Sequence, residues 1–173
     1  KKSGHSGKIP LSAADSAFAG AVDAAQLIAN SASEAGIEIE VVREPNDGYW
    51  SNVWNNDAKG WCACYWGGRP TEDWIFSAAY TNDTEWNDTN WKGTDGSKKF
   101  NALVIQARAE LDDTKRREIY YECQSLISDD GGSIVPLFNS YVSANSKSIA
   151  MDDQVAANWD SDGAKCVERW WFA

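Results

Sequence analysis

The sequence predicts an α/β fold in which a mixed sheet is flanked by helices. A strand, a helix and a second strand follow one another within residues 8–42. An uncharged aromatic run over residues 60–66 then leads through two glycines into a new helix. Two amphipathic helices within residues 98–128 come before an apolar run. Strands that alternate with helices are typical of sheets covered by helices.

The first part of the chain has the pattern of a β-α-β unit. Residues 8–14 form an apolar run typical of a strand, and we expect a helix N-cap at residues 15–16. Apolar residues at three- and four-residue spacing over 18–32 predict a helix, which should end at Gly36. Residues 37–42, IEIEVV, alternate as a half-buried strand does. A parallel pair with a right-handed crossover is therefore expected.

The rest of the chain adds helices and one more strand. The strand is predicted over residues 133–142, and Pro136 places it at a sheet edge or at a crossing between sheets. Residues 81–97 have the composition of a loop, yet they hold Trp86 and Trp91, so we expect this loop to pack against the protein. Helices are predicted around residues 49–54 and over residues 74–80, 98–110 and 112–128.

The candidate binding site lies around residues 60–74, GWCACYWGGRPTEDW. A strand here would deliver aromatic rings and thiols to a loop, and α/β proteins bind ligands at the carboxyl ends of strands. The loop should enter a helix near Pro70 or Thr71. The predicted ligand contacts are Trp61, Cys64, Tyr65, Trp66 and Arg69, with Asp73 and Trp50 behind them.

Each of these residues has a structural alternative. Trp61 and Tyr65 alternate with Cys62 and Cys64 along the strand, so one of these two sets would face the core and the other the cleft or a covering helix. Core packing is thus the alternative for Trp61, Tyr65 and Trp66. Arg69 could bind a carboxylate of the ligand through two hydrogen bonds, or it could pair with Asp73 and fix the loop. Four-residue spacing between Trp50 and Trp54 also suits the packing face of a helix. The sequence leaves these alternatives open.

Composition excludes several functional classes. The chain has 173 residues with 43% hydrophobic content, enough for one well-packed domain. A net charge of −10 argues against nucleic acid as a partner, because phosphate binding needs clustered lysine and arginine. No apolar run is long enough for a membrane-spanning helix, and residues 1–8 do not resemble a signal peptide. We expect any targeting signal to lie outside this sequence.

The four cysteines do not predict a metal centre. His5 is the single histidine, and it lies near one end of the chain. Cys62 and Cys64 would lie on one face of a strand, about 6 to 7 Å apart, and would form a disulfide only with distortion. An oxidising compartment would permit a disulfide, for which Cys123 with Cys166 is the preferred pair. Reduced thiols and a four-thiolate zinc site are the alternatives, and no cofactor is predicted.

Three segments carry a resemblance to a known family. They are AQLIANSASEAGIEIEV over 25–41, WCACY over 61–65 and YYECQSLISDDGGSIVPLF over 120–138. In order and spacing they resemble the C-terminal part of the extracellular solute-binding proteins, family 5, that serve peptide and oligopeptide ABC importers. The resemblance covers nearly the whole chain. It implies a type II periplasmic-binding-protein-like lobe over residues 1–139 and a return segment toward the first lobe over 140–173.

The same resemblance implies a function without catalysis. The chain would be most of the second lobe of a periplasmic, monomeric protein. It would capture a small organic solute such as a peptide, an opine or an oligosaccharide, and deliver it to a membrane permease. Peptide-binding members carry an aspartate at the place of Cys64, where it pairs with the ammonium of the ligand. An ammonium buried without a counter-charge is costly, so Asp73 or Glu72 would have to replace that aspartate.

Two other functional classes, a carbohydrate-binding protein and an enzyme, are alternatives to the predicted solute-binding protein of an importer. Ten tryptophans would suit a carbohydrate-binding protein, although carbohydrate-binding modules are usually all-β, whereas this chain predicts several helices. An enzyme is not expected, because one histidine near the terminus cannot be built into a nucleophile and base pair. A glycosidase with paired carboxylates stays open on composition alone.

Overall fold

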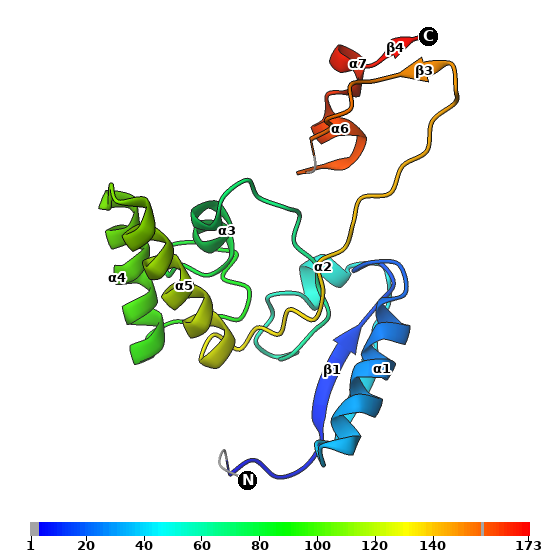
Figure 1. Cartoon of the computed structure of the whole chain (residues 1–173). Coiled ribbons are helices and arrows are strands. Elements are labelled where there is room, and N and C mark those ends of the chain that lie inside the picture. Colours follow the sequence, from blue (N-terminus) through cyan, green and yellow to red (C-terminus); the bar gives the residue numbers. More distant parts are fainter. Residues whose placement is uncertain (1–3, 157) are drawn as a thin grey trace. The chain divides into compact units, whose positions relative to one another are not determined.

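The fold is described from a computed structural model, which covers residues 4–156 and 158–173. The chain divides into two compact units, one ending at Trp66 and the other running from Gly67 to Ala173. Both units are mixtures of helices and short strands, so the α/β class is confirmed in its general form (Figure 1). The boundary predicted after residue 139 concerns the lobes of a larger protein, and it stays a prediction.

The first unit contains the predicted β-α-β arrangement. Strand β1 (Ile9–Ala13) pairs in parallel with β2 (Ile39–Arg43). Helix α1 (Ala21–Glu34) connects the two strands and lies beside β1 (Figure 1). The helix begins later than the predicted N-cap, because Gly20 adopts a left-handed conformation with φ of 80°. It ends as predicted, with Gly36 also left-handed. The buried face of α1 consists of small side chains, Ala21, Ala25 and Ala29.

The predicted strand over residues 60–66 is reduced to a single bridge. Ser12 of β1 donates to the Trp61 carbonyl at 3.0 Å, and Ala63 donates back to the Ser12 carbonyl at 2.8 Å. The Ala63 carbonyl does not continue a ladder, because it accepts from the Tyr49 hydroxyl at 2.7 Å. Tyr49 begins the short helix α2 (Tyr49–Asn52). A side chain therefore takes the place that a strand partner would have.

Three helices form the main part of the second unit. They are α3 (Glu72–Ala79), α4 (Asp95–Ala109) and α5 (Asp113–Asp129), and α4 lies alongside α5 (Figure 1). The predictions of these helices are confirmed within a few residues. Each begins at a side-chain cap that accepts backbone N–H groups, namely Thr71, Thr94 and Asp112.

Aromatic rings form the core among these helices. Phe100 of α4 lies 5.5 Å from the ring of Phe76 in α3 and 5.3 Å from the ring of Trp91. The Trp91 indole donates to the Asp130 carboxylate at 2.8 Å. Asp130, which follows the end of α5, therefore holds the ring of Trp91 in place. As predicted, the loop holding Trp91 packs against the protein.

The predicted strand over residues 133–142 is absent from the structure. The segment is extended, but none of the described residues pairs with it as a strand. Its apolar side chains are exposed, and Phe138 is 95% exposed. An apolar strand pattern needs a neighbouring strand to become a ladder, and the described chain does not supply one here.

Short elements complete the C-terminal part of the chain. Strand β3 (Ile149–Ala150) pairs antiparallel with β4 (Trp171–Phe172). The two short helices between them are α6 (Asp160–Ala164) and α7 (Cys166–Arg169). The tryptophan-rich terminus, which had no predicted structure, thus becomes one strand of a small ladder. None of the described helices is long and apolar enough to cross a membrane.

Candidate functional site

Five aromatic side chains of the first unit contact one another, three from residues 49–54 and two from the segment 61–66. We call them the aromatic cluster. Within it, the Trp50 ring lies 5.6 Å from the ring of Tyr65, and the Trp54 ring lies 6.2 Å from the ring of Trp66. The rings meet edge to face, the geometry that their quadrupoles favour. The members of the aromatic cluster are Tyr49, Trp50, Trp54, Tyr65 and Trp66.

Two members of the aromatic cluster present ring surface to solvent. Tyr65 is 59% exposed and Trp50 is 39% exposed, whereas Tyr49 is buried. The Trp50 indole donates to the Ser16 carbonyl at 3.2 Å, which orients its ring. These two exposed rings, supported from behind by other rings, could stack against a flat or apolar part of a ligand.

Trp61 faces the core of the first unit. It is partly buried against the cluster of Leu11, Ala13 and Ala25, as is Ala63. Cys62 packs on the other side, against the cluster that contains Tyr49. The alternation expected from the sequence is therefore present at these positions, and the contacts of Trp61 favour its structural alternative.

Glu44 and Lys59 form an ion pair in the first unit. The Glu44 carboxylate, 9% exposed, accepts from Lys59 Nζ at 2.9 Å and from the Ser12 hydroxyl at 3.0 Å. The bond from Lys59 lowers the pKa of Glu44 below its usual range. This carboxylate is therefore engaged with a cation of the protein itself.

Arg69 and Asp73 belong to the second unit. Arg69 donates to the Gly67 carbonyl at 2.8 Å, so it bends back onto its own loop. Asp73 pairs with Arg108 of α4 at 2.8 Å, and this bond is the main cause of the raised pKa of Arg108. The expected alternative, an ion pair between Arg69 and Asp73, is not the pair observed for Asp73. Asp73 joins the start of α3 to α4 instead.

The cysteines are reduced in the structure. The preferred disulfide, Cys123 with Cys166, is therefore wrong for this structure, in which both thiols are unbonded. Cys123 is fully buried in α5, and burial raises its pKa to about 11. Among the described residues, no group of three or more histidine, cysteine or acidic side chains could hold a metal ion.

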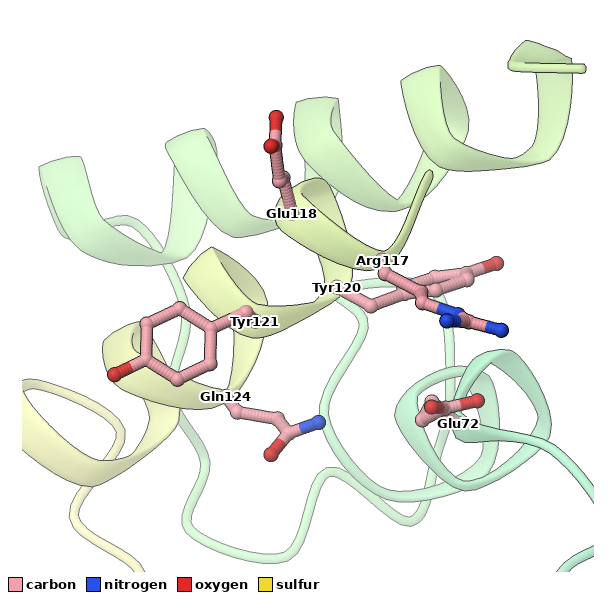
Figure 2. Close-up of a pocket in the computed structure, with 6 residues that line it drawn as sticks. All are labelled: Glu72, Arg117, Glu118, Tyr120, Tyr121 and Gln124. Atoms are coloured by element: carbon pink, nitrogen blue, oxygen red, sulfur yellow. The ribbon is translucent and has the colours of Figure 1, made fainter. Parts of the chain in front are cut away.

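A shallow depression lies on the surface of the second unit, between α3 and α5 (Figure 2). Its volume is about 410 Å³, and its lining includes Tyr120, Tyr121 and Gln124 of α5 together with Glu72 of α3, toward which Arg117 extends. Arg117 and Glu118 complete the lining. Of the residues considered as ligand contacts from the sequence, this depression includes Glu72, the alternative to Asp73 as partner of an ammonium, and it includes none of the aromatic or thiol contacts. The adjacent tyrosines of α5 are a signal for this surface that the sequence offers.

The comparisons with known proteins support the fold. No family model matches the sequence, and no curated protein is a match. A similar fold occurs in the solved structure of the ABC transporter substrate-binding protein CtaP of Listeria monocytogenes, with a TM-score of 0.57 and 22% identity. The similarity covers 75% of this chain and 26% of that protein, so the chain spans about a quarter of its length. The chain shares its fold with part of a substrate-binding protein.

Proposed function

We propose that this chain is part of the solute-binding protein of an ABC importer. In this proposal it forms most of one lobe of a type II periplasmic binding protein, and the solute is held in a cleft that another lobe closes. The observation that carries the proposal is the fold shared with part of a substrate-binding protein. Catalysis is not part of the proposed role.

The aromatic cluster supplies the ligand-binding surface in this proposal. Trp50 and Tyr65 present exposed rings on a rigid support, which suits a protein that selects ligands by stacking and shape. Cys64 and Trp66 lie in the same segment and belong to the same proposed surface. Arg69 and Asp73 stay predicted contacts, and Trp61 would act by fixing the segment from the core side.

The chemistry of the first unit limits the class of solute. Cys64 offers a thiol where a carboxylate would pair with an ammonium, and the Glu44 carboxylate is held by Lys59. We therefore expect the part of the solute that meets the aromatic cluster to be uncharged. A peptide-like compound bound through its side chains or backbone fits this surface better than one bound through a free N-terminus.

The proposed role implies a permease and a periplasmic location. The protein would be monomeric and would present its closed form to the permease. The exposed apolar segment over residues 134–142 supports the presence of a further packed lobe, since Phe138 and its neighbours would be covered by it. Coverage of only 26% of the substrate-binding neighbour supports the same view.

The experiment is a ligand search with the full-length protein. Mass spectrometry of small molecules that copurify with it identifies the solute, and tryptophan fluorescence then gives Kd for the wild type and variants. Trp50→Ala and Tyr65→Ala should each weaken binding by about 2 kcal/mol, roughly 30-fold in Kd. Tyr121→Ala, which removes a more exposed ring on α5, should leave Kd unchanged and serves as the control. Unchanged affinity in both site variants would remove the aromatic cluster from the binding surface.

A carbohydrate-binding protein is the second candidate, and the exposed tryptophan and tyrosine rings favour it. Sugars stack their apolar faces on such rings. Copurification of an oligosaccharide, with loss of binding in Trp50→Ala, would select this candidate over a peptide-like solute.

A further inference from the structure

The Cys-x-Cys motif of the first unit lies in a backbone segment of fixed geometry. The two hydrogen bonds that Ser12 exchanges with Trp61 and Ala63 hold the segment extended beside β1. Trp61 and Ala63 pack toward one side, onto the core that includes Leu11. In extended backbone successive side chains point to opposite faces. Cys62 and Cys64 alternate with Trp61 and Ala63, so the two cysteines share the other face.

The face of the segment that carries the cysteines is turned toward Tyr49 at Cys62. Cys62 packs against the cluster that contains Tyr49. The pKa of Tyr49 is raised, first by burial and then by the charges that Cys62 and Cys64 can carry. Tyr49 is held in place by its bond to the Ala63 carbonyl. By the alternation of extended backbone, the two thiols share one side of the segment, and both cysteines are only half-buried, so a small ion can reach them.

The distance between the two cysteines determines whether a disulfide or a bound metal ion joins their sulfurs with less distortion. Cysteines two apart in extended backbone have Cα atoms about 6.6 Å apart, near the upper limit of disulfides, whose sulfurs must approach to about 2.05 Å. Two bonds from sulfur to a metal, each about 2.3 Å long, separate the sulfurs by about 4.6 Å when they are collinear. A single ion between the thiolates therefore needs less distortion than a disulfide does.

The number of available ligands narrows the choice of metal. Structural zinc takes four ligands, and the described residues offer no group of three or more candidate ligands. Thiolates select soft cations such as Cu(I), which is stable with two sulfur ligands in a line.

We infer that Cys62 and Cys64 form a two-thiolate site for the soft monovalent cation Cu(I). On binding, both thiols lose their protons to solvent and the cation joins the two sulfurs, so the site carries one net negative charge and no electron is transferred. The inference goes beyond the proposed solute-binding role and does not depend on it.

Competition for Cu(I) tests the site. The full chain is titrated without oxygen against the Cu(I) complex of bicinchoninate, whose absorbance reports the copper removed. We expect one equivalent to be removed, and Cys62→Ser and Cys64→Ser should each lower the affinity at least about 100-fold. Cys166→Ser removes a half-buried cysteine of the second unit and should behave as the wild type does. Circular dichroism checks that each variant is folded.

X-ray absorption of the copper complex gives a second, independent readout. Two sulfur neighbours in a line are expected. A site with nitrogen or oxygen ligands, or with three sulfurs, overturns the inference. So does full retention of Cu(I) by either site variant, equal loss in Cys166→Ser, or failure of the wild type to compete with bicinchoninate. Since solute binding is measured separately, these outcomes leave the proposed function untouched.

Discussion

Replacing Tyr49 with phenylalanine tests how the segment that carries the candidate site is held. The Tyr49 side chain is 1% exposed, and its hydroxyl lies 2.7 Å from the Ala63 carbonyl and 3.2 Å from the Ser12 carbonyl. Tyr49→Phe keeps the ring and removes only the hydroxyl. The Ala63 carbonyl then loses its hydrogen-bond donor in a half-buried position.

The expected loss follows from the hydrogen bond removed. A buried acceptor left without a donor destabilises by about 1 to 3 kcal/mol, which corresponds to about 5- to 140-fold in an opening equilibrium. Two amides report this opening directly, because Ser12 N–H donates to Trp61 and Ala63 N–H donates to Ser12. Amide hydrogen exchange measured by NMR should therefore quicken at both by a factor in this range.

The control is the same chemical change at an exposed tyrosine. Tyr121 of α5 is 72% exposed, so Tyr121→Phe should leave the exchange of Ser12 and Ala63 unchanged. Equal protection of these two amides in Tyr49→Phe and in the wild type would refute the view that this hydroxyl fixes the segment. An equal increase of amide exchange throughout the chain in Tyr49→Phe would also contradict this view, because the effect should be local to the first unit.

Three further predictions concern stability and reactivity. Trp91→Phe removes the indole donor to the Asp130 carboxylate and should lower the free energy of unfolding by about 2 kcal/mol in urea, whereas exposed Trp86→Phe should change it little. The pKa of Glu44 is lowered in the folded state, so its stabilisation is complete above the unfolded pKa of about 4.3 and is lost as pH falls through the folded pKa. The wild type should then exceed Glu44→Gln in stability at pH 6 and lose this advantage near pH 3; an advantage independent of pH would contradict the assignment. The Cys123 thiol, with its pKa raised to about 11, should be the last of the cysteines to react with iodoacetamide at pH 8, as peptide mass spectrometry can show.

Apolar periodicity was sufficient to predict α3, α4 and α5 within a few residues, whereas the short helices α6 and α7 were not predicted. Helix α4 begins after Thr94 and α5 after Asp112, both residues that cap helices well, and the apolar spacing continues through each helix. The start of α1 was predicted too early, because Asp15 and Ser16 are as good caps as any. Only the left-handed conformation of Gly20 fixes the observed start.

Contacts between distant residues were not predictable from spacing. Asn87 is 1% exposed, and its amide donates to the carbonyls of Tyr80, Thr81 and Trp91, which organises a loop that the sequence describes only as polar. The prediction of a strand over residues 133–142 was wrong for a related reason. Its apolar pattern is correct for a strand, but a ladder also requires a partner, which a local pattern cannot reveal.

The candidate site was predicted in part. The stretch containing Tyr65 was singled out for its aromatic content, and the structure places that ring against Trp50, fifteen positions earlier in the sequence. The predicted strand there was too long, because Tyr49 occupies the Ala63 carbonyl. The role of Asp73 was open between the ligand and Arg69, and Arg108 is the partner observed.

The most direct test of the solute-binding account is isothermal titration of one solute into two proteins. The solute is the one that copurifies with the full-length protein, and the proteins are that full-length form and the 173-residue chain alone. The account predicts tight binding by the full-length protein and binding at least about 100-fold weaker by the chain alone, because the opposing lobe supplies the rest of the contacts. Nanomolar binding by the chain alone would contradict the proposed half-cleft.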